Sequence, residues 1–375
     1  VEFSESSDMN RPTASDVGLA VINNVYDGMG IDDEWAEWND RGFSWWGCQN
    51  RQRVWVEEGV DDDGFTLYRL HARTDLCTGF CDTDEQLNFL LVTAPLMTLS
   101  GFARDPENPT MLQLATSVYV HEGNKEWARI LFNMAVGMQV AEAATISENM
   151  AAEFGMSPAA SEHPVSGSRE DLDEMLEIFE LLPMGEQSSA YAGEELESTT
   201  NLLDNGGSVF TNSDANGVTA EFPHPDLTWL LQIRADEGHT RAGNGLLSLL
   251  TMPDGQADLV NARHALELNE LELESFTRTA FAGTWCAAKN GLTFVSFSPN
   301  CLYRKGCIQN IVLAQIIRGV WISQEVLDYS WEEHYESCLE RKNEQLVGLM
   351  KLFGDDHSEN QSSGASGFFK SLFGK

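Results

Sequence analysis

Residues 53–75 read RVWVEEGVDDDGFTLYRLHARTD, and the fold class follows from this stretch. Side chains of alternating character run along residues 53–58 and again along residues 65–75. A period of two is typical of strands. Between them, residues 61–64 (DDDG) form a turn signal. We therefore expect two antiparallel strands joined by a tight turn.

Helices and strands are expected on both sides of this hairpin, so the first half of the chain is predicted to be an α+β module. Five apolar side chains recur after Asn124 at spacings of 4, 3, 4 and 3 residues, which places them on one face of a long helix. We interpret that face as core. The five are Trp127, Leu131, Met134, Met138 and Ala141. The other expected elements are a helix near 14–26, a helix over about 83–102 with a kink or break at Pro95, and a strand over 111–120.

A similar order of elements follows residues 157–168 (SPAASEHPVSGS), a stretch without apolar periodicity that predicts a domain boundary. Residues 257–276 have a clear helical pattern, and residues 307–327 form a nearly all-round apolar helix that must be largely buried. The remaining expected elements are helices over 171–182 and 194–203, and strands over 208–222, 227–236, 246–252 and 292–297.

Two local matches point to an internal duplication. Residues 69–75 (RLHARTD) align with residues 230–236 (LLQIRAD) at an offset of 161, with Leu, Arg and Asp in common. Residues 87–88 align with residues 268–269, Leu-Asn in both, at an offset of 181. The second copy would then carry about twenty extra residues, which include the strand over 246–252. The matching order of elements is the stronger argument, and two unrelated α+β domains are the alternative.

The charge balance narrows the classes of partner. The chain has 59 acidic and 23 basic residues, a net charge of −36, and a field of that sign repels phosphate backbones and anionic lipid. Nucleic-acid binding is therefore not expected. Among the basic residues Arg outnumbers Lys, which fits either a saline habitat or a generic acidic surface that keeps a protein soluble.

The cysteines and the apolar runs bear on the compartment. Seven cysteines occur without a regular framework, and residues 1–10 are polar and acidic, unlike a secretory signal. A membrane span requires roughly 18 apolar residues, and the run over 87–99 is interrupted at Thr93 and Pro95. We therefore expect a cytoplasmic protein with reduced thiols.

The predicted organisation has five parts: an N-terminal α+β module (1–156), a linker (157–169), a C-terminal α+β module (170–330), a helical extension (331–353) and a flexible tail (354–375). The tail ends in an apolar peptide beside Lys370 and Lys375, in contrast to the acidic body. Such a peptide suits docking in a groove or weak membrane contact, and an inert tail is the alternative. Its apolar residues are Phe368, Phe369, Leu372 and Phe373.

The best polar cluster follows the strand over 227–236, where charged side chains at a strand end can line a groove. Arg234 could pair with a carboxylate and His239 could donate or accept a hydrogen bond. An ordinary surface ion pair beside a turn is the alternative, and nearby aromatic residues are either a groove for apolar side chains or core. The candidate binding residues are Arg234, Asp236, His239, Arg241, Asn244, Trp229 and Trp285, with Arg73 and Asp75 at the aligned positions of the first half.

Two further constellations are weak. His224, Asp236 and His239 have the ligand types of a zinc or iron site but no spacing that guarantees convergence. A thiol hydrolase could be assembled from Cys286 with His239 and Asp236, although the local sequence supplies only the residue types. Glycine-rich phosphate loops are absent from the sequence. We predict no catalytic residue, no metal and no cofactor.

The order of helix, antiparallel strands, helix, strand and long helix, given twice, resembles the type III secretion chaperone-like and YbjN-like domains. The resemblance covers about residues 14–154 and 170–327, and it includes residues 231–236 (LQIRAD) and 285–300 (WCAAKNGLTFVSFSPN). It implies a tandem pair of domains without enzymatic activity, in which curved sheets and helix faces hold a polypeptide segment. The acidic extension after Leu327 departs from that pattern.

The sequence therefore predicts a non-enzymatic, chaperone-like protein whose partner is a peptide segment or client protein. One alternative is a small hydrolase that uses the region from Arg234 to His239, and another is a structural scaffold. A peptide binder needs an open apolar groove, whereas an enzyme needs convergent titratable groups in a closed pocket.

Overall fold

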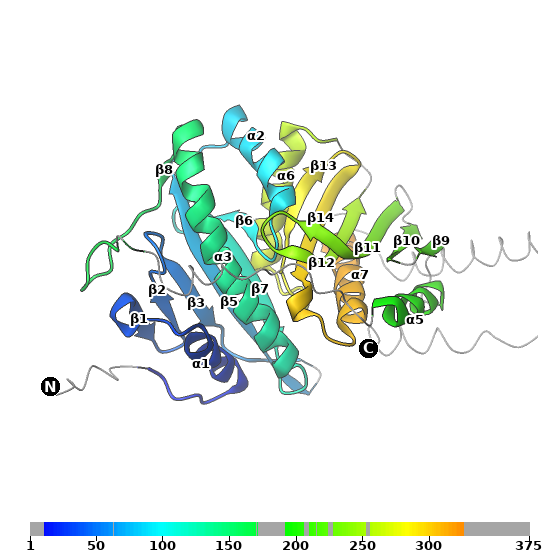
Figure 1. Cartoon of the computed structure of the whole chain (residues 1–375), viewed down its shortest axis with the longest axis horizontal. Coiled ribbons are helices and arrows are strands. Elements are labelled where there is room, and N and C mark those ends of the chain that lie inside the picture. The colour runs from blue at the N-terminus through cyan, green and yellow to red at the C-terminus, as the bar shows by residue number, and fades with distance from the viewer. Residues whose placement is uncertain are drawn as a thin grey trace, which may run out of the picture.

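The computed structural model describes residues 11–62, 64–169, 171, 192–205, 210–214, 216–223, 228–252 and 256–325. Within this part the chain is an α+β protein with two antiparallel sheets, each packed against helices (Figure 1), which confirms the predicted fold class. The helix expected over 171–182, the extension over 331–353 and the tail over 354–375 lie outside the described residues.

The first half contains a sheet whose strand order is β1-β2-β3-β5-β7-β6. Helices α1 and α3 lie side by side against one face of this sheet, and α2 precedes β6. Two short strands, β4 and β8, pair with β5 outside the main path. In chain order the elements are α1 (Val17–Met29), β1 (Ala36–Asn39), β2 (Gly42–Trp45), β3 (Gln52–Val56), β4 (Val60–Asp62), β5 (Phe65–Thr78), α2 (Asp84–Thr93), β6 (Gly101–Arg104), β7 (Met111–Val120), α3 (Lys125–Glu153) and β8 (Ser157–Pro158).

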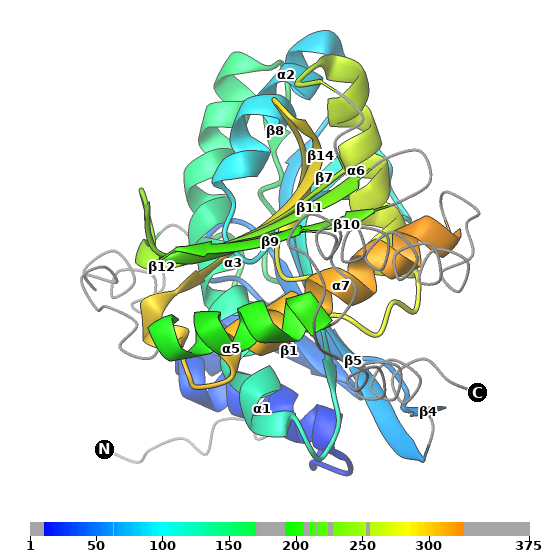
Figure 2. The ribbon, with the colours of Figure 1, turned by 90° about the vertical axis from the view of Figure 1, so that its right-hand side faces the viewer.

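The second half contains a sheet whose strand order is β9-β10-β11-β12-β14-β13. Helices α5 and α7 lie side by side against one face of it (Figure 2). In chain order the elements are α5 (Ala192–Asn205), β9 (Phe210–Asp214), β10 (Gly217–Pro223), β11 (Thr228–His239), β12 (Gly243–Met252), α6 (Leu259–Glu274), β13 (Thr284–Ala288), β14 (Gly291–Pro299) and α7 (Cys307–Glu325).

The two halves have the same topology. Each runs from a helix through a four-strand meander to a second helix, a two-strand hairpin and a long helix, and each hairpin adds to the last meander strand in the same order. This supports the duplication. The alignment at an offset of 161 is nevertheless wrong, because it superposes β5 on β11 whereas the topology matches β5 with β12. The strand over 246–252 is thus no insertion but the counterpart of β5.

A buried contact repeats as well. On α3 the fully buried Gln139 meets the hydroxyl of Thr74 in β5, with 2.8 Å between the two side-chain oxygens. On α7 the buried Gln315 donates to the hydroxyl of Ser248 in β12 at 2.7 Å. Each long helix therefore places one glutamine over a hydroxyl of the fourth meander strand, which satisfies polar groups that burial would otherwise leave unpaired.

The predicted hairpin is confirmed: β3 and β5 pair antiparallel, and β4 pairs with β5 up to the turn at Gly64. Other bounds were wrong. The helix expected over 83–102 ends at Thr93, and residues 101–104 form β6 instead. Residues 208–222 contain two strands rather than one. Cys286 lies in β13, a strand that was not predicted.

Helix α3 is buried on two sides. Its deepest side chains, among them Phe132 and Val136, are fully buried in one cluster with core residues of the first sheet. The predicted stripe lies beside them and turns toward the second half: Met134 and Met138 pack against Phe297 of β14. The predicted core stripe is therefore core only in part: Leu131 and Met138 are buried, whereas Trp127, Met134 and Ala141 are half-buried.

The two modules share a core rather than each closing its own. Side chains from α2 and β6 pack in one cluster with Leu266 of α6 and Cys286 of β13, and the α2 and α6 ribbons lie together in Figure 1. Backbone bonds also join the modules, since Ser117 N–H donates to Phe281 O at 3.0 Å. The segment expected as a linker is itself held on the first module, where β8 pairs with β5 and Ser161 accepts from Trp46.

Candidate functional site

The strand-end cluster forms fixed structural contacts. Arg234 forms an ion pair with Asp214 of β9 across the hairpin, and not with Asp236. Asp236 is exposed and lies at a bulge with a φ of 56°, where its carboxylate accepts from Asn300 at 2.7 Å. The bulge turns this carboxylate away from the regular strand alternation, which the sequence pattern could not show.

His239 connects the two modules. Its Nδ1 accepts from the N–H groups of Arg241 and Ala242 at 3.2 and 3.1 Å, so its Nε2 carries the proton and donates to Leu96 O at 3.0 Å. Burial lowers the pKa of this imidazole, and its ring packs on Phe297. Both ring nitrogens are thus occupied by backbone groups.

The other candidate residues do not join that cluster. Trp229 and Trp285 are buried core residues, 3% and 1% exposed, and Trp285 Nε1 donates to Glu272 at 2.9 Å. Arg73 and Asp75 are buried in β5 of the other sheet. Arg241 is exposed and Asn244 is half-buried. His224 and the tail residues Phe368, Phe369, Leu372 and Phe373 lie outside the described residues.

An open groove lies between the modules, where α3 of the first half faces α7 and β14 of the second. Its volume is about 70 Å³, and it opens to solvent. Trp127, Ile311 and Ala314 are half-buried in its apolar walls, so part of their surface remains accessible. The lining residues are Trp127, Leu131, Ala280, Ala282, Phe294, Ser296, Ser298, Asn310, Ile311, Ala314, Gln315 and Arg318.

Arg318 is the one titratable side chain in that lining. Its Nε donates to Glu272 at 2.8 Å, one terminal nitrogen to Gln315 at 2.9 Å, and the other to Ala280 O at 2.6 Å. Its guanidinium also lies 3.6 Å from the centroid of the Phe294 ring. Burial lowers the pKa of Arg318, whereas the Glu272 charge raises it. The guanidinium is therefore committed to the core and does not present a free charge to the groove.

The polar groups of the groove are mostly used by the protein. The Ser296 hydroxyl donates to Ala282 O at 2.5 Å, and the Asn310 amide donates to Gly306 O at 2.9 Å. An opening with apolar walls and no convergent acid and base can hold apolar side chains. It offers no group that could transfer a proton at the pH of a cell.

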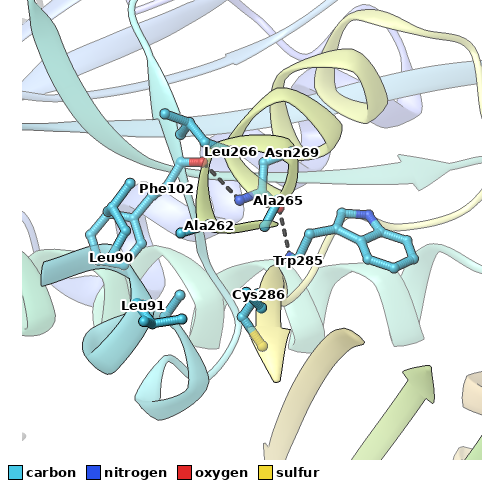
Figure 3. A pocket seen from close by; sticks show the side chains of 11 residues that line it. Leu90, Leu91, Phe102, Ala262, Ala265, Leu266, Asn269, Trp285 and Cys286 are labelled. Carbon is cyan, nitrogen blue, oxygen red and sulfur yellow. Dashed lines mark hydrogen bonds between the residues drawn. The ribbon is translucent and has the colours of Figure 1, made fainter. Parts of the chain in front are cut away.

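A second, smaller pocket lies between α2 and α6, where Figure 3 shows Leu90, Leu266 and Phe102 around Asn269. Both ends of the Asn269 amide are used, because its nitrogen donates to Phe102 O at 3.0 Å and its oxygen accepts from Trp285 N–H at 2.7 Å. This pocket is packing space between the modules.

The thiol constellation is not assembled. Cys286 lines the small pocket and is 1% exposed, and burial raises the pKa of its thiol to about 12. Cys286 packs among apolar residues of the core between the modules, whereas His239 bonds only to backbone groups. Within the described residues, no group of three or more His, Cys, Asp or Glu side chains could hold a metal ion.

Comparison with protein-family models, with curated proteins and with solved structures finds no match for this chain. In the part of the chain that the structure describes, residues 125–147 of α3 are long and apolar enough to cross a membrane by composition. That window is 67% buried within the protein.

The groove was only partly foreseen from the sequence. Trp127 and Leu131 belonged to the predicted core stripe. The sequence analysis missed Arg318, because its partner Glu272 lies 46 residues earlier in the chain and the pair forms only when the two helices pack together. The available signal was that α3 has apolar side chains on more than one face, which indicates a helix covered from two sides.

Proposed function

We propose that this chain is a non-enzymatic, chaperone-like protein that binds an apolar polypeptide segment in the groove between α3 and α7. The observation that carries the proposal is the groove itself: it is open and apolar, and its one ionisable side chain is engaged with Glu272. The hydrolase alternative lacks a comparable site among the described residues, because His239 is held by backbone groups.

The duplicated topology supports a binding role. A groove between two copies of one module contains an equivalent helix on each wall, so its width depends on how the modules pack. Helix-in-groove and extended-peptide binders use such surfaces, with apolar anchors that give affinity. The resemblance of the element order to secretion-chaperone-like domains agrees with this function, as does the excess of negative charge, which favours ligands that combine apolar and basic residues.

The chain contains one such ligand. Residues 368–375 read FFKSLFGK, with four apolar side chains and two lysines. Fourteen residues of the preceding stretch (354–367) would span about 20 Å as a flexible coil. We therefore propose residues 368–375 as a ligand that binds within the chain or competes with a client peptide.

The test uses a variant that ends at residue 353 and a synthetic FFKSLFGK peptide labelled with a fluorophore. We expect saturable binding by fluorescence anisotropy, weakened at least tenfold by Ala314→Leu, which fills the groove without removing a contact. A matched control is Val260→Leu, since Val260 is 62% exposed on α6 and away from the groove. Binding that is absent, or equal in the two variants, would refute the groove as the peptide site.

A further inference from the structure

Cationic side chains gather on the face of the first sheet that is opposite α3. Arg53 of β3 lies directly opposite Arg73 of β5, and His71 and Arg69 follow Arg73 on the same face of β5. Like charges directly opposite each other on neighbouring strands destabilise a sheet. This arrangement therefore needs a compensating group.

Several buried nitrogen atoms of this cluster are unpaired among the described residues. Arg69, His71 and Arg73 are 5%, 2% and 8% exposed. Among the described residues, no hydrogen-bond partner is found for the Nε of Arg53, Arg69 and Arg73 or for the Nδ1 of His71, although all four atoms are buried. Leaving a buried polar group unpaired costs about 1–3 kcal/mol, and more when the group is charged.

Arg73 is the extreme case. Its one hydrogen bond to a described residue is from a terminal nitrogen to the Gln113 amide oxygen, at 3.5 Å. Burial lowers the pKa of this guanidinium, the Arg53 charge lowers it further, and Asp105 and Glu274 act in the opposite direction without forming an ion pair with it. Buried cations normally have a paired anion or bound water, because an unpaired buried charge is strongly destabilising.

The neighbouring carboxylates pair with Arg51, Arg53 and His71, and Arg53 lies at ion-pair distance from both Asp105 and Asp75, at 2.7 and 3.7 Å. Asp75 accepts from Gln113 at 2.7 Å and pairs with Arg51 at 3.1 Å. Asp105 pairs with Arg53 at 2.7 Å, and Glu57 accepts from His71 at 2.8 Å. Arg69 donates to the Glu272 carbonyl and the Ser117 hydroxyl. Within the described residues, Arg69 and Arg73 thus have no carboxylate at ion-pair distance.

The cluster is closed on the β7 side and partly exposed on the β3 side. The residues of β7 opposite Arg73 and His71, Ala115 and Ser117, are fully buried. On the β3 side, the side chain of Arg53 is 28% exposed and that of Glu57 is 51% exposed. A small ligand would therefore reach the cluster along β3, past Arg53, and arginine binds carboxylate and phosphate through paired N–H groups.

We propose that Arg53, Arg69 and Arg73 form a binding site for a small oxyanion that carries a phosphate or carboxylate group. The anion would accept from the unpaired N–H groups and neutralise Arg73, because Arg53 already pairs with Asp105. Because the whole chain is strongly acidic, long-range attraction does not assist binding, and recognition rests on these short-range hydrogen bonds. This site is on a different face from the peptide groove and does not depend on that proposal.

The test measures binding of inorganic phosphate, with acetate as the carboxylate probe, at constant ionic strength by isothermal titration calorimetry and thermal unfolding. We expect phosphate or acetate to bind the intact chain and raise its Tm, with affinity at least tenfold weaker in Arg73→Met. Arg53→Gln is the second variant, because its partly exposed site tolerates change if Arg73→Met does not fold. Arg278→Met, at an exposed arginine paired with Asp62, is the matched control.

The unliganded variants supply an independent readout. Without added anion, Arg73→Met is expected to be at least as stable as the unsubstituted chain, since a purely structural arginine would lower the Tm when removed. A response to acetate alone would identify the ligand group as a carboxylate, and a response to phosphate alone as a phosphate. No binding of either probe to the unsubstituted chain, or binding to Arg73→Met and Arg53→Gln as tight as to the unsubstituted chain, would overturn the proposal.

Discussion

Replacement of Glu142 by Gln is expected to flatten the pH dependence of stability between pH 5 and pH 8. Glu142 lies on α3 at the junction of the modules, 3% exposed, where one carboxylate oxygen accepts from the Thr98 N–H at 3.2 Å and from its hydroxyl at 2.9 Å. The other carboxylate oxygen is buried without a partner. Burial raises the pKa of Glu142 to about 7, although Thr98 and the charge of Arg241 lower it.

The sign and size follow from linkage. The folded protein keeps a proton on Glu142 up to about pH 7, whereas the unfolded chain releases it near the ordinary pKa of 4.5. The free energy of unfolding therefore falls by about 1.4 kcal/mol per pH unit across this window, about 3 kcal/mol in all. His71 and His239 have lowered pKa values and act in the opposite direction, but they are common to both proteins and cancel in the comparison.

The assay is urea denaturation of the unsubstituted chain and of Glu142→Gln at pH 5, 6, 7 and 8, at one ionic strength. From pH 5 to pH 8, the unsubstituted chain should lose about 3 kcal/mol more unfolding free energy than Glu142→Gln does. Glu126→Gln is the control, because that side chain lies on the same helix and is 75% exposed. Parallel curves for the unsubstituted chain and Glu142→Gln would refute the assignment of the buried proton.

Two other predictions concern the core between the modules. Arg318→Met is expected to lower the unfolding free energy by about 3–5 kcal/mol, because Glu272 would keep a buried charge without its partner. Adding Glu272→Met should recover much of that loss in chemical denaturation, and simple additivity of the two single losses would contradict the pairing. Cys81 is exposed, whereas Cys286 is buried and the pKa of its thiol is raised to about 12. A thiol reagent at pH 8 should therefore modify Cys81 promptly and Cys286 only when the protein unfolds. Peptide mapping by mass spectrometry checks this, and rapid labelling of native Cys286 would show that the core opens.

Local patterns predicted the elements whose two faces differ in character. The alternation over 65–75 and the turn at 61–64 predicted β5 and its hairpin, because apolar Leu70 and Ala72 alternate with polar Arg69, His71 and Arg73 although both faces are buried. The helical period over 257–276 and the apolar run over 307–327 located α6 and α7 to within a few residues. No strand was predicted at β13, since four consecutive buried residues carry no periodicity that identifies a strand.

The candidate site could be predicted less well, because its residues are far apart in the chain. Neither the alternation nor the composition could show that Asp236 sits in a bulge, or that His239 donates to Leu96, 143 residues away. Arg73 was selected because it aligned with Arg234, an alignment that the topology contradicts. Within the described part of the chain, Arg73 lacks a charged partner because the strand register places Arg53 opposite it. Strand register is set by the assembled sheet and cannot be read from local sequence.

What the sequence determined by itself was the type and approximate extent of most elements, the acidity and the repetition of their order, because these depend on side-chain chemistry along the chain. What only the tertiary structure decided was which repeats correspond, how α3 shares its two faces between the modules, and where the groove and the opposed arginines lie. Those features depend on packing and strand register between segments that are many residues apart. The free energy that stabilises such contacts comes from burial in a common core and not from local propensity.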